Sequence, residues 1–137
     1  MADESEERSV HRYEAFSDIV IGFSLAQLGA SLVVPRQTID LVHNPIWLLG
    51  FTWAFAMVCA LWWFHHRFFA SLFVPRPGPV LLNFLWLGVV ILCVYSSQVW
   101  IHFPADLIAL RIYFISFALA YGVLALQYRI CMPSALP

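Results

Sequence analysis

The sequence predicts an all-α integral membrane protein with four transmembrane helices per subunit. Hydrophobic residues make up 62% of the 137-residue chain and charged residues only 11%, and its mean hydropathy is +0.81. A soluble domain carries about a quarter charged residues, and so short a chain cannot bury this much apolar surface away from water. Four apolar stretches are long enough to cross a bilayer as helices. No stretch shows the alternation expected of a barrel strand.

The first two predicted spans cover about residues 15–34 and 46–64. The first is expected to stop at Pro35, because proline interrupts a helix. The second follows Pro45, which suits the first helical turn. Residues 1–11 form a polar, acidic tail rather than a secretory signal, which would need a basic start and a short apolar core.

The other two predicted spans cover about residues 80–100 and 106–127. The helix-breaking run PRPGP at 75–79 precedes the third, and the fourth ends just before Arg129. A short tail at 130–137 follows. The loops leave no room for a second domain, so the whole chain is expected to be one transmembrane domain whose function lies in the helices or in their assembly.

Arginine alone supplies the positive charge of the chain and predicts its orientation. Four spans place both termini on one side of the membrane, with five arginines: Arg8, Arg12, Arg67, Arg76 and Arg129. The other side has Arg36 and Arg111. The positive-inside rule therefore favours cytoplasmic termini. A net charge of −1 without a basic patch excludes a nucleic-acid partner.

The first span carries more polar and small residues than the others. Serines recur every seven residues, at Ser17, Ser24 and Ser31. Small residues recur every four, at Gly22, Ala26 and Ala30. These repeats are typical of close helix packing. Gln27 supports a second interpretation, a helix that lines a water-filled path, because an unpaired amide in hydrocarbon is costly.

Asp18 lies just inside the first span, where an ionisable residue needs a partner. The predicted topology places several polar side chains at its level: Arg12, Ser17, His65, His66 and Asn83. Carboxylate, guanidinium, imidazole and amide groups can satisfy one another in a buried network. We expect this structural network to hold the first helix.

The sequence gives no sign of a metal, a cofactor or an enzyme. His65 and His66 point about 100° apart on a helix, so they rarely bind one metal together. A structural hydrogen bond is the favoured role for one of them, and pH sensing is the alternative. Cys59, Cys93 and Cys131 lack motif spacing and are expected to be free thiols. No nucleophile has a base at useful spacing.

Three segments resemble the lysosomal potassium channel family and its bacterial relatives. RYEAFSD at 12–18 matches the signature R-x-x-x-F-S-D, at the start of the first helix. W-x-x-H-H-x-x-F occurs at 62–69, and LLNFLWL carries Asn83 near the start of the third span. In this order the segments cover roughly the first 100 residues.

The resemblance implies a potassium-permeable channel of a bacterial inner membrane, assembled as a homo-tetramer with the first helices around its axis. In the family a bulky apolar residue, here Phe23, forms the constriction. A hydroxyl residue associated with cation selectivity is replaced here by Ala26, and Gln27 could supply an oxygen instead. One helical face would line the pore with Ile19, Phe23, Ala26, Gln27 and Ala30.

Two functions remain open at this point. The first is a potassium-permeable cation channel with a hydrophobic constriction on the first helix. The second is a non-conducting membrane protein that uses the same fold for assembly or sensing, a reading favoured by the bulk of Phe23 and the missing hydroxyl at Ala26. Bacterial relatives usually have six spans, against four here. Either function has the lipid bilayer and further copies of the chain as partners.

Overall fold

The computed structural model describes residues 2–32, 37, 39 and 45–132. They form four helices: α1 (Ala2–Ala30), α3 (Ile46–Ser71), α4 (Pro77–His102) and α5 (Leu107–Cys131). The described residues include no strand. The predicted all-α class is therefore confirmed.

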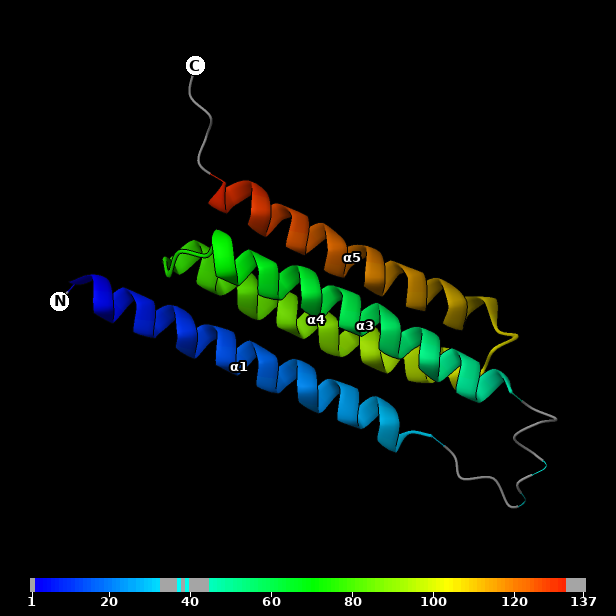
Figure 1. Ribbon diagram of the computed structural model, residues 1–137. Coiled ribbons are helices and arrows are strands. Elements are labelled where there is room, and N and C mark those ends of the chain that lie inside the picture. The colour runs from blue at the N-terminus through cyan, green and yellow to red at the C-terminus, as the bar shows by residue number, and fades with distance from the viewer. Residues whose placement is uncertain (1, 33–36, 38, 40–44, 133–137) are drawn as a thin grey trace.

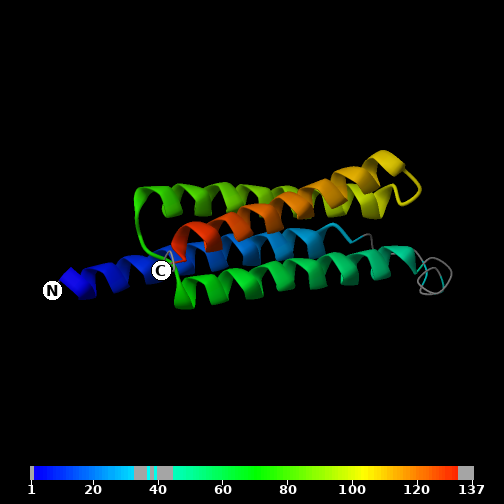
Figure 2. The ribbon, with the colours of Figure 1, turned by 90° about the horizontal axis from the view of Figure 1, so that it is seen from above.

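The four helices lie side by side and run alternately in opposite directions (Figure 1). Seen from above, α3 and α4 lie on either side of α1 and α5, which face each other across the bundle (Figure 2). α4 packs against all three other helices, and α1 packs against α3 and α4. Among the described helices, α1 is therefore held from one side only.

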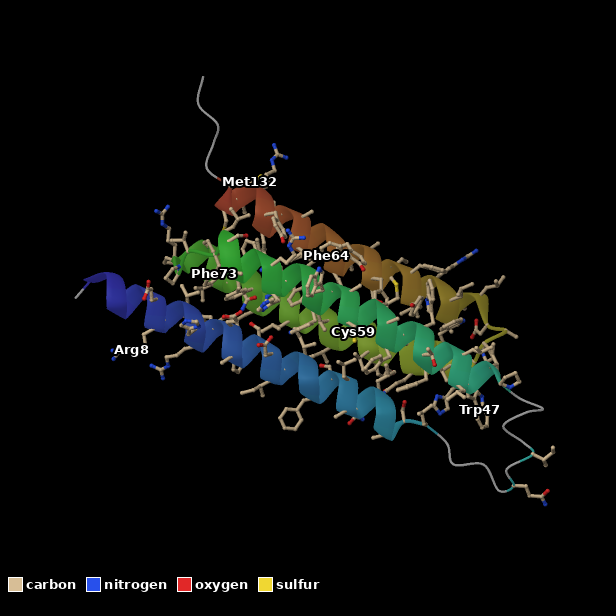
Figure 3. All side chains as sticks on the ribbon, viewed as in Figure 1. Arg8, Trp47, Cys59, Phe64, Phe73 and Met132 are labelled. Carbon is tan, nitrogen blue, oxygen red and sulfur yellow. The ribbon has the colours of Figure 1, made fainter. Side chains whose placement is uncertain are left out.

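The bundle has two ends, which we call proximal and distal. α1 begins at the proximal end and finishes at the distal end. Figure 3 shows Arg8, Phe73 and Met132 near the proximal end, Trp47 at the distal end and Cys59 between them.

Local sequence explains where the helices begin. Pro77 occupies the first turn of α4, where its missing N–H would have no helical partner. Asp106 caps α5, because its Oδ1 accepts from the Ile108 amide at 2.7 Å. Gly50 lets α3 approach α4 near the distal end, since a Cβ there would lie 3.0 Å from Ile101 Cγ1.

The core follows the inner side of α4, where Trp86, Val90 and Cys93 have no exposed surface. A smaller aromatic cluster closes the proximal end below it. There the rings of Phe69 and Phe73 stack with centroids 4.1 Å apart. The core thus fixes α4 as the element against which α1 is positioned.

Three helices, α3, α4 and α5, are long and apolar enough to cross a membrane. At 1.5 Å per residue, the 26 residues of α3 or α4 span about 39 Å, more than the hydrocarbon core of about 30 Å. The predicted spans 46–64 and 80–100 lie within α3 and α4. The span 106–127 lies within α5 except for its first residue, the cap.

α1 differs from its predicted span, 15–34. Unlike α3, α4 and α5, it is not among the helices that are both long and apolar enough to cross a membrane. It begins at Ala2, so the predicted tail at 1–11 is helical from that residue on, and it ends at Ala30. Residues 33–36, with Arg36 of the charge comparison, lie outside the described residues, as do residues 133–137 of the C-terminal tail.

Candidate pore helix and the network behind it

A chain of hydrogen bonds joins three helices in the proximal half of the bundle. Asn83 Nδ2 donates to Ser17 Oγ at 3.1 Å, and His65 Nε2 lies 2.8 Å from Asn83 Oδ1. Ser17 Oγ itself donates to the Tyr13 carbonyl at 2.8 Å. Because that uses the only hydroxyl proton, Ser17 accepts from the amide, and His65 must donate through Nε2. Ser17, His65 and Asn83 are all buried, and each makes at least one of these hydrogen bonds.

Trp86 extends the network to α5. Its ring stacks on His65 with centroids 4.1 Å apart and planes 4° from parallel. Its indole Nε1 donates to the Ala120 carbonyl at 3.0 Å. A buried tryptophan usually needs a partner for this N–H. The polar chain therefore runs from α1 through α4 and α3 to the backbone of α5.

A second connection joins α1 directly to α3. Trp62 Nε1 donates to Asp18 Oδ1 at 2.8 Å. The Trp62 ring stacks on His66 with centroids 5.5 Å apart, and His66 Nδ1 lies 3.1 Å from Glu14 Oε1. Two carboxylates of α1 therefore contact α3: Asp18 through Trp62, and Glu14 through His66.

The opposite face of α1 is open. It carries the residues expected to line a pore, all of them exposed: Ile19, Phe23, Ala26, Gln27 and Ala30. Phe23 is the most exposed of the large hydrophobic residues that the structure describes, with 75% of its surface exposed. An apolar ring and an amide therefore project together from the side of α1 that faces away from the core of the described helices.

A groove of about 480 Å³ runs along this face between α1 and α4. Ile19, Phe23 and Gln27 line it from α1, and Tyr95 and Gln98 are among its residues on α4. It combines apolar side chains with two amides and a phenol.

Residues 12–93 match the family model described as "Endosomal/lysosomal potassium channel TMEM175". The match covers more than half of the chain. The chain belongs to this family. The matched residues include the network behind α1 and Phe23 on its open face, and they end before Gln98.

A potassium channel of Chamaesiphon minutus is 30% identical to the chain over 117 residues. The alignment covers 80% of this chain and 54% of the relative, so the chain spans about half the length of the curated relative it matches. No solved structure matches the chain.

The structure brings together part of the network expected from the sequence of this family member. Three of its residues share one chain of bonds: Ser17, His65 and Asn83. Asp18 pairs with Trp62 rather than with Arg12 or a histidine. Arg12 is exposed, and no hydrogen bond or ion pair recorded for the described residues includes it.

Sequence reasoning missed three partners: Trp62, Trp86 and Glu14. Trp62 lies one helical turn before His66, on the same face of α3, and this spacing could have pointed to it. Glu14 lies one turn before Asp18 on α1, and the same rule applies. For Trp86, the sequence offered only its position one turn after Asn83 as an indication that it belongs to the network.

The two repeats of α1 face different ways. Ser17 and Ser24 are buried, and both donate to carbonyls of their own helix at 2.8 Å. Gly22, Ala26 and Ala30 are exposed, and no heavy atom lies within 4 Å of a Cβ built on Gly22. Within one subunit the serines face the bundle, and the small residues leave room for something outside it.

Cys59, Cys93 and Cys131 are free. Across residues 2–32, 37, 39 and 45–132, no three His, Cys, Asp or Glu side chains gather in a way that could hold a metal ion.

Proposed function

We propose that the chain is one subunit of a homo-oligomeric, potassium-permeable cation channel whose axis is lined by α1. The observation that carries the proposal is the open face of α1, which projects Phe23 and Gln27. Facing lipid, the Gln27 amide would lose its hydrogen bonds to water, whereas a water-filled axis would satisfy it. The family and the name of the relative from Chamaesiphon minutus support potassium as the permeant ion.

Phe23 is the proposed constriction. A ring of apolar side chains across a narrow axis gates by excluding water. Gln27 lies one turn further along the same face and would present an amide oxygen from each subunit. Ile19, Ala26 and Ala30 would complete the lining, with Ala26 at the place where relatives carry a hydroxyl.

The network of Ser17, Asn83 and His65 lies on the other side of α1 and would not touch ions. Its proposed role is to hold α1 so that Phe23 keeps its place at the axis. Asp18 and Trp62 support the same helix from α3.

We further propose a tetramer in the inner membrane of a bacterium, with cytoplasmic termini. Five arginines belong to the proximal end: Arg8, Arg12, Arg67, Arg76 and Arg129. At the distal end the described residues contribute Arg111. This asymmetry supports a cytoplasmic proximal end.

A non-conducting protein that uses the same fold for assembly or sensing is the second candidate. Phe23 is bulkier than the aliphatic constriction usual in the family, and Ala26 lacks the hydroxyl. Both features would also fit an axis that is permanently closed.

Potassium flux from liposomes that contain the purified protein tests the proposal. Phe23→Ala should raise the flux, because a smaller side chain lowers the dewetting barrier, by about tenfold for each ~1.4 kcal/mol removed. Phe114→Ala is the matched control, since Phe114 is 59% exposed on α5, away from the groove. Absence of flux from both the folded wild type and Phe23→Ala would reject the channel and favour the second candidate.

A further inference from the structure

A side-chain hydrogen bond joins the distal end of α1 to α4. Gln98 Nε2 donates to the backbone carbonyl of Gln27 at 3.1 Å. We propose that Gln98 is a positioning residue that holds the distal end of the pore-lining face and thereby fixes where the Gln27 side chain points. The effect on ions rests on the proposed function, whereas the anchoring of α1 does not.

The end of α1 needs such support. The last carbonyls of a helix have no intrahelical donors, and here the bonding pattern already loosens. The Ser31 amide is shared between the Gln27 carbonyl at 3.2 Å and the Leu28 carbonyl at 3.3 Å. The Gln98 amide therefore supplies the Gln27 carbonyl with a second donor, from a different helix.

The turn of α4 that carries the Gln98 donor is well packed. Gln98 is partly buried and lies close to the end of α4. Its own carbonyl lies 2.8 Å from His102 Nδ1, one turn further on. Two buried serines, Ser96 and Ser97, precede it on the side of α4 that faces the core. The amide thus projects from a well-packed turn.

The contact completes a pair of holding points on α1. The first is at Ser17 and Asp18, held from α4 and α3. The second is at Gln27, held from α4. Phe23 lies between them on the open face, so both points help to set its distance from α4, together with Ile21 and Leu28, which pack into the core. Gln98 lies beyond residues 12–93, so the family match does not include it.

Hydrogen–deuterium exchange tests the anchor without any need for conduction. Gln98→Met keeps the length of the side chain and removes the donor, and Gln98→Glu keeps its shape with a carboxylate that cannot donate. Peptides covering residues 27–31 should exchange about twofold to tenfold faster in both variants, as expected for one lost neutral hydrogen bond. Tyr95→Phe is the control, because it alters the same groove and leaves the Gln27 carbonyl bonded. Exchange as slow as in the wild type would overturn the anchor.

Planar-bilayer recordings test the positioning role. Under a potassium/sodium gradient, Gln98→Met should shift the reversal potential and change the unitary conductance, and Tyr95→Phe should do neither. If Gln98 only stabilised the fold, Gln98→Met would lower the number of active channels and leave the reversal potential and the unitary conductance at their wild-type values. That result would overturn the positioning role. If the wild type passes no ions, the channel proposal fails, and the exchange experiment still decides the anchor. Circular dichroism establishes that each variant is folded, and native mass spectrometry establishes that it is assembled.

Discussion

Asn83 uses both ends of its amide at a depth where few partners exist. Its Nδ2 donates to Ser17 on α1, and its Oδ1 accepts from His65 on α3. A buried amide with one end unpaired would carry a penalty that a fully bonded amide avoids. Because Asn83 contacts residues of two other helices, its loss removes a partner from each of them: His65 loses the acceptor of its Nε2–H, and Ser17 Oγ loses a donor.

Asn83→Leu should therefore destabilise the protein more than the loss of one contact suggests. We expect a fall in the free energy of unfolding of about 1–3 kcal/mol for each polar atom left unpaired. Denaturant unfolding in detergent, followed by circular dichroism, would measure it. Ser17→Ala should add little once Asn83 is replaced, because coupled residues are not additive. Fully additive effects would show that the three residues do not act together.

Ser71→Ala is the matched control for the loss of a serine hydroxyl. Ser71 is exposed at the end of α3, and its hydroxyl donates to the Arg67 carbonyl of its own helix. The free energy of unfolding should change by less than about 0.5 kcal/mol, the range of ordinary surface substitutions.

The residues of the network were partly predictable from sequence. Ser17, His65 and Asn83 stand out because a polar atom within an apolar run needs a partner. The partner of Asp18 was predicted from charge, as an arginine or a histidine. The structure instead uses the indole N–H of Trp62. Tryptophan counts as apolar in a hydropathy pattern, so the pattern does not reveal its indole N–H as a possible hydrogen-bond donor.

The ends of a helix and the ends of its membrane-spanning part are determined by different physical effects. Hydropathy predicts the part of a helix that lipid covers, whereas prolines limit the helix itself. α3 continues past the predicted end at 64 to Ser71, shortly before Pro75. α1 extends back to Ala2, because its polar start is rich in Glu and Arg, which favour helix. The sequence therefore predicted the number and order of the helices better than their ends.

The attachment of α1 to α3 can be weakened by one change. Trp62→Phe keeps the aromatic packing against His66 and removes the N–H that Asp18 accepts. We expect a loss of about 1 kcal/mol in the free energy of unfolding, at the low end for a charged acceptor because the pair is partly exposed. Amide exchange in the α1 peptide covering residues 13–20 should rise accordingly.

Trp63→Phe provides the control at the neighbouring position. Trp63 is 54% exposed, and the hydrogen bonds recorded for the described residues do not include it. Exchange in α1 should stay at the wild-type rate in this variant. Equal effects of the two substitutions would show that aromatic bulk, rather than the bond to Asp18, holds α1 against α3.

At the scale of the whole molecule, the outer surfaces of the helices differ in kind. α4 and α5 present large apolar side chains, such as Leu81 and Leu107, which are 71% and 66% exposed. Lipid covers such a surface at no cost. α1 presents Gln27 beside Phe23 and a stripe of small residues. This surface of α1 therefore matches lipid less well than the surfaces of α4 and α5, and the proposed assembly around α1 would cover it.

The small residues of α1 give the sharpest test of that assembly. Gly22→Leu fills open space on the stripe of small residues of α1, where a close approach of the proposed subunits would depend on small side chains. Overpacking a helix contact costs about 1–3 kcal/mol, so native mass spectrometry should show loss of the tetramer, at four times the 15.7 kDa of one chain, in favour of smaller species. Gly122→Leu adds the same side chain in open space on α5, beside an apolar groove, and should leave the tetramer intact. A tetramer that survives Gly22→Leu would show that the small residues around Gly22 do not form a close contact between subunits.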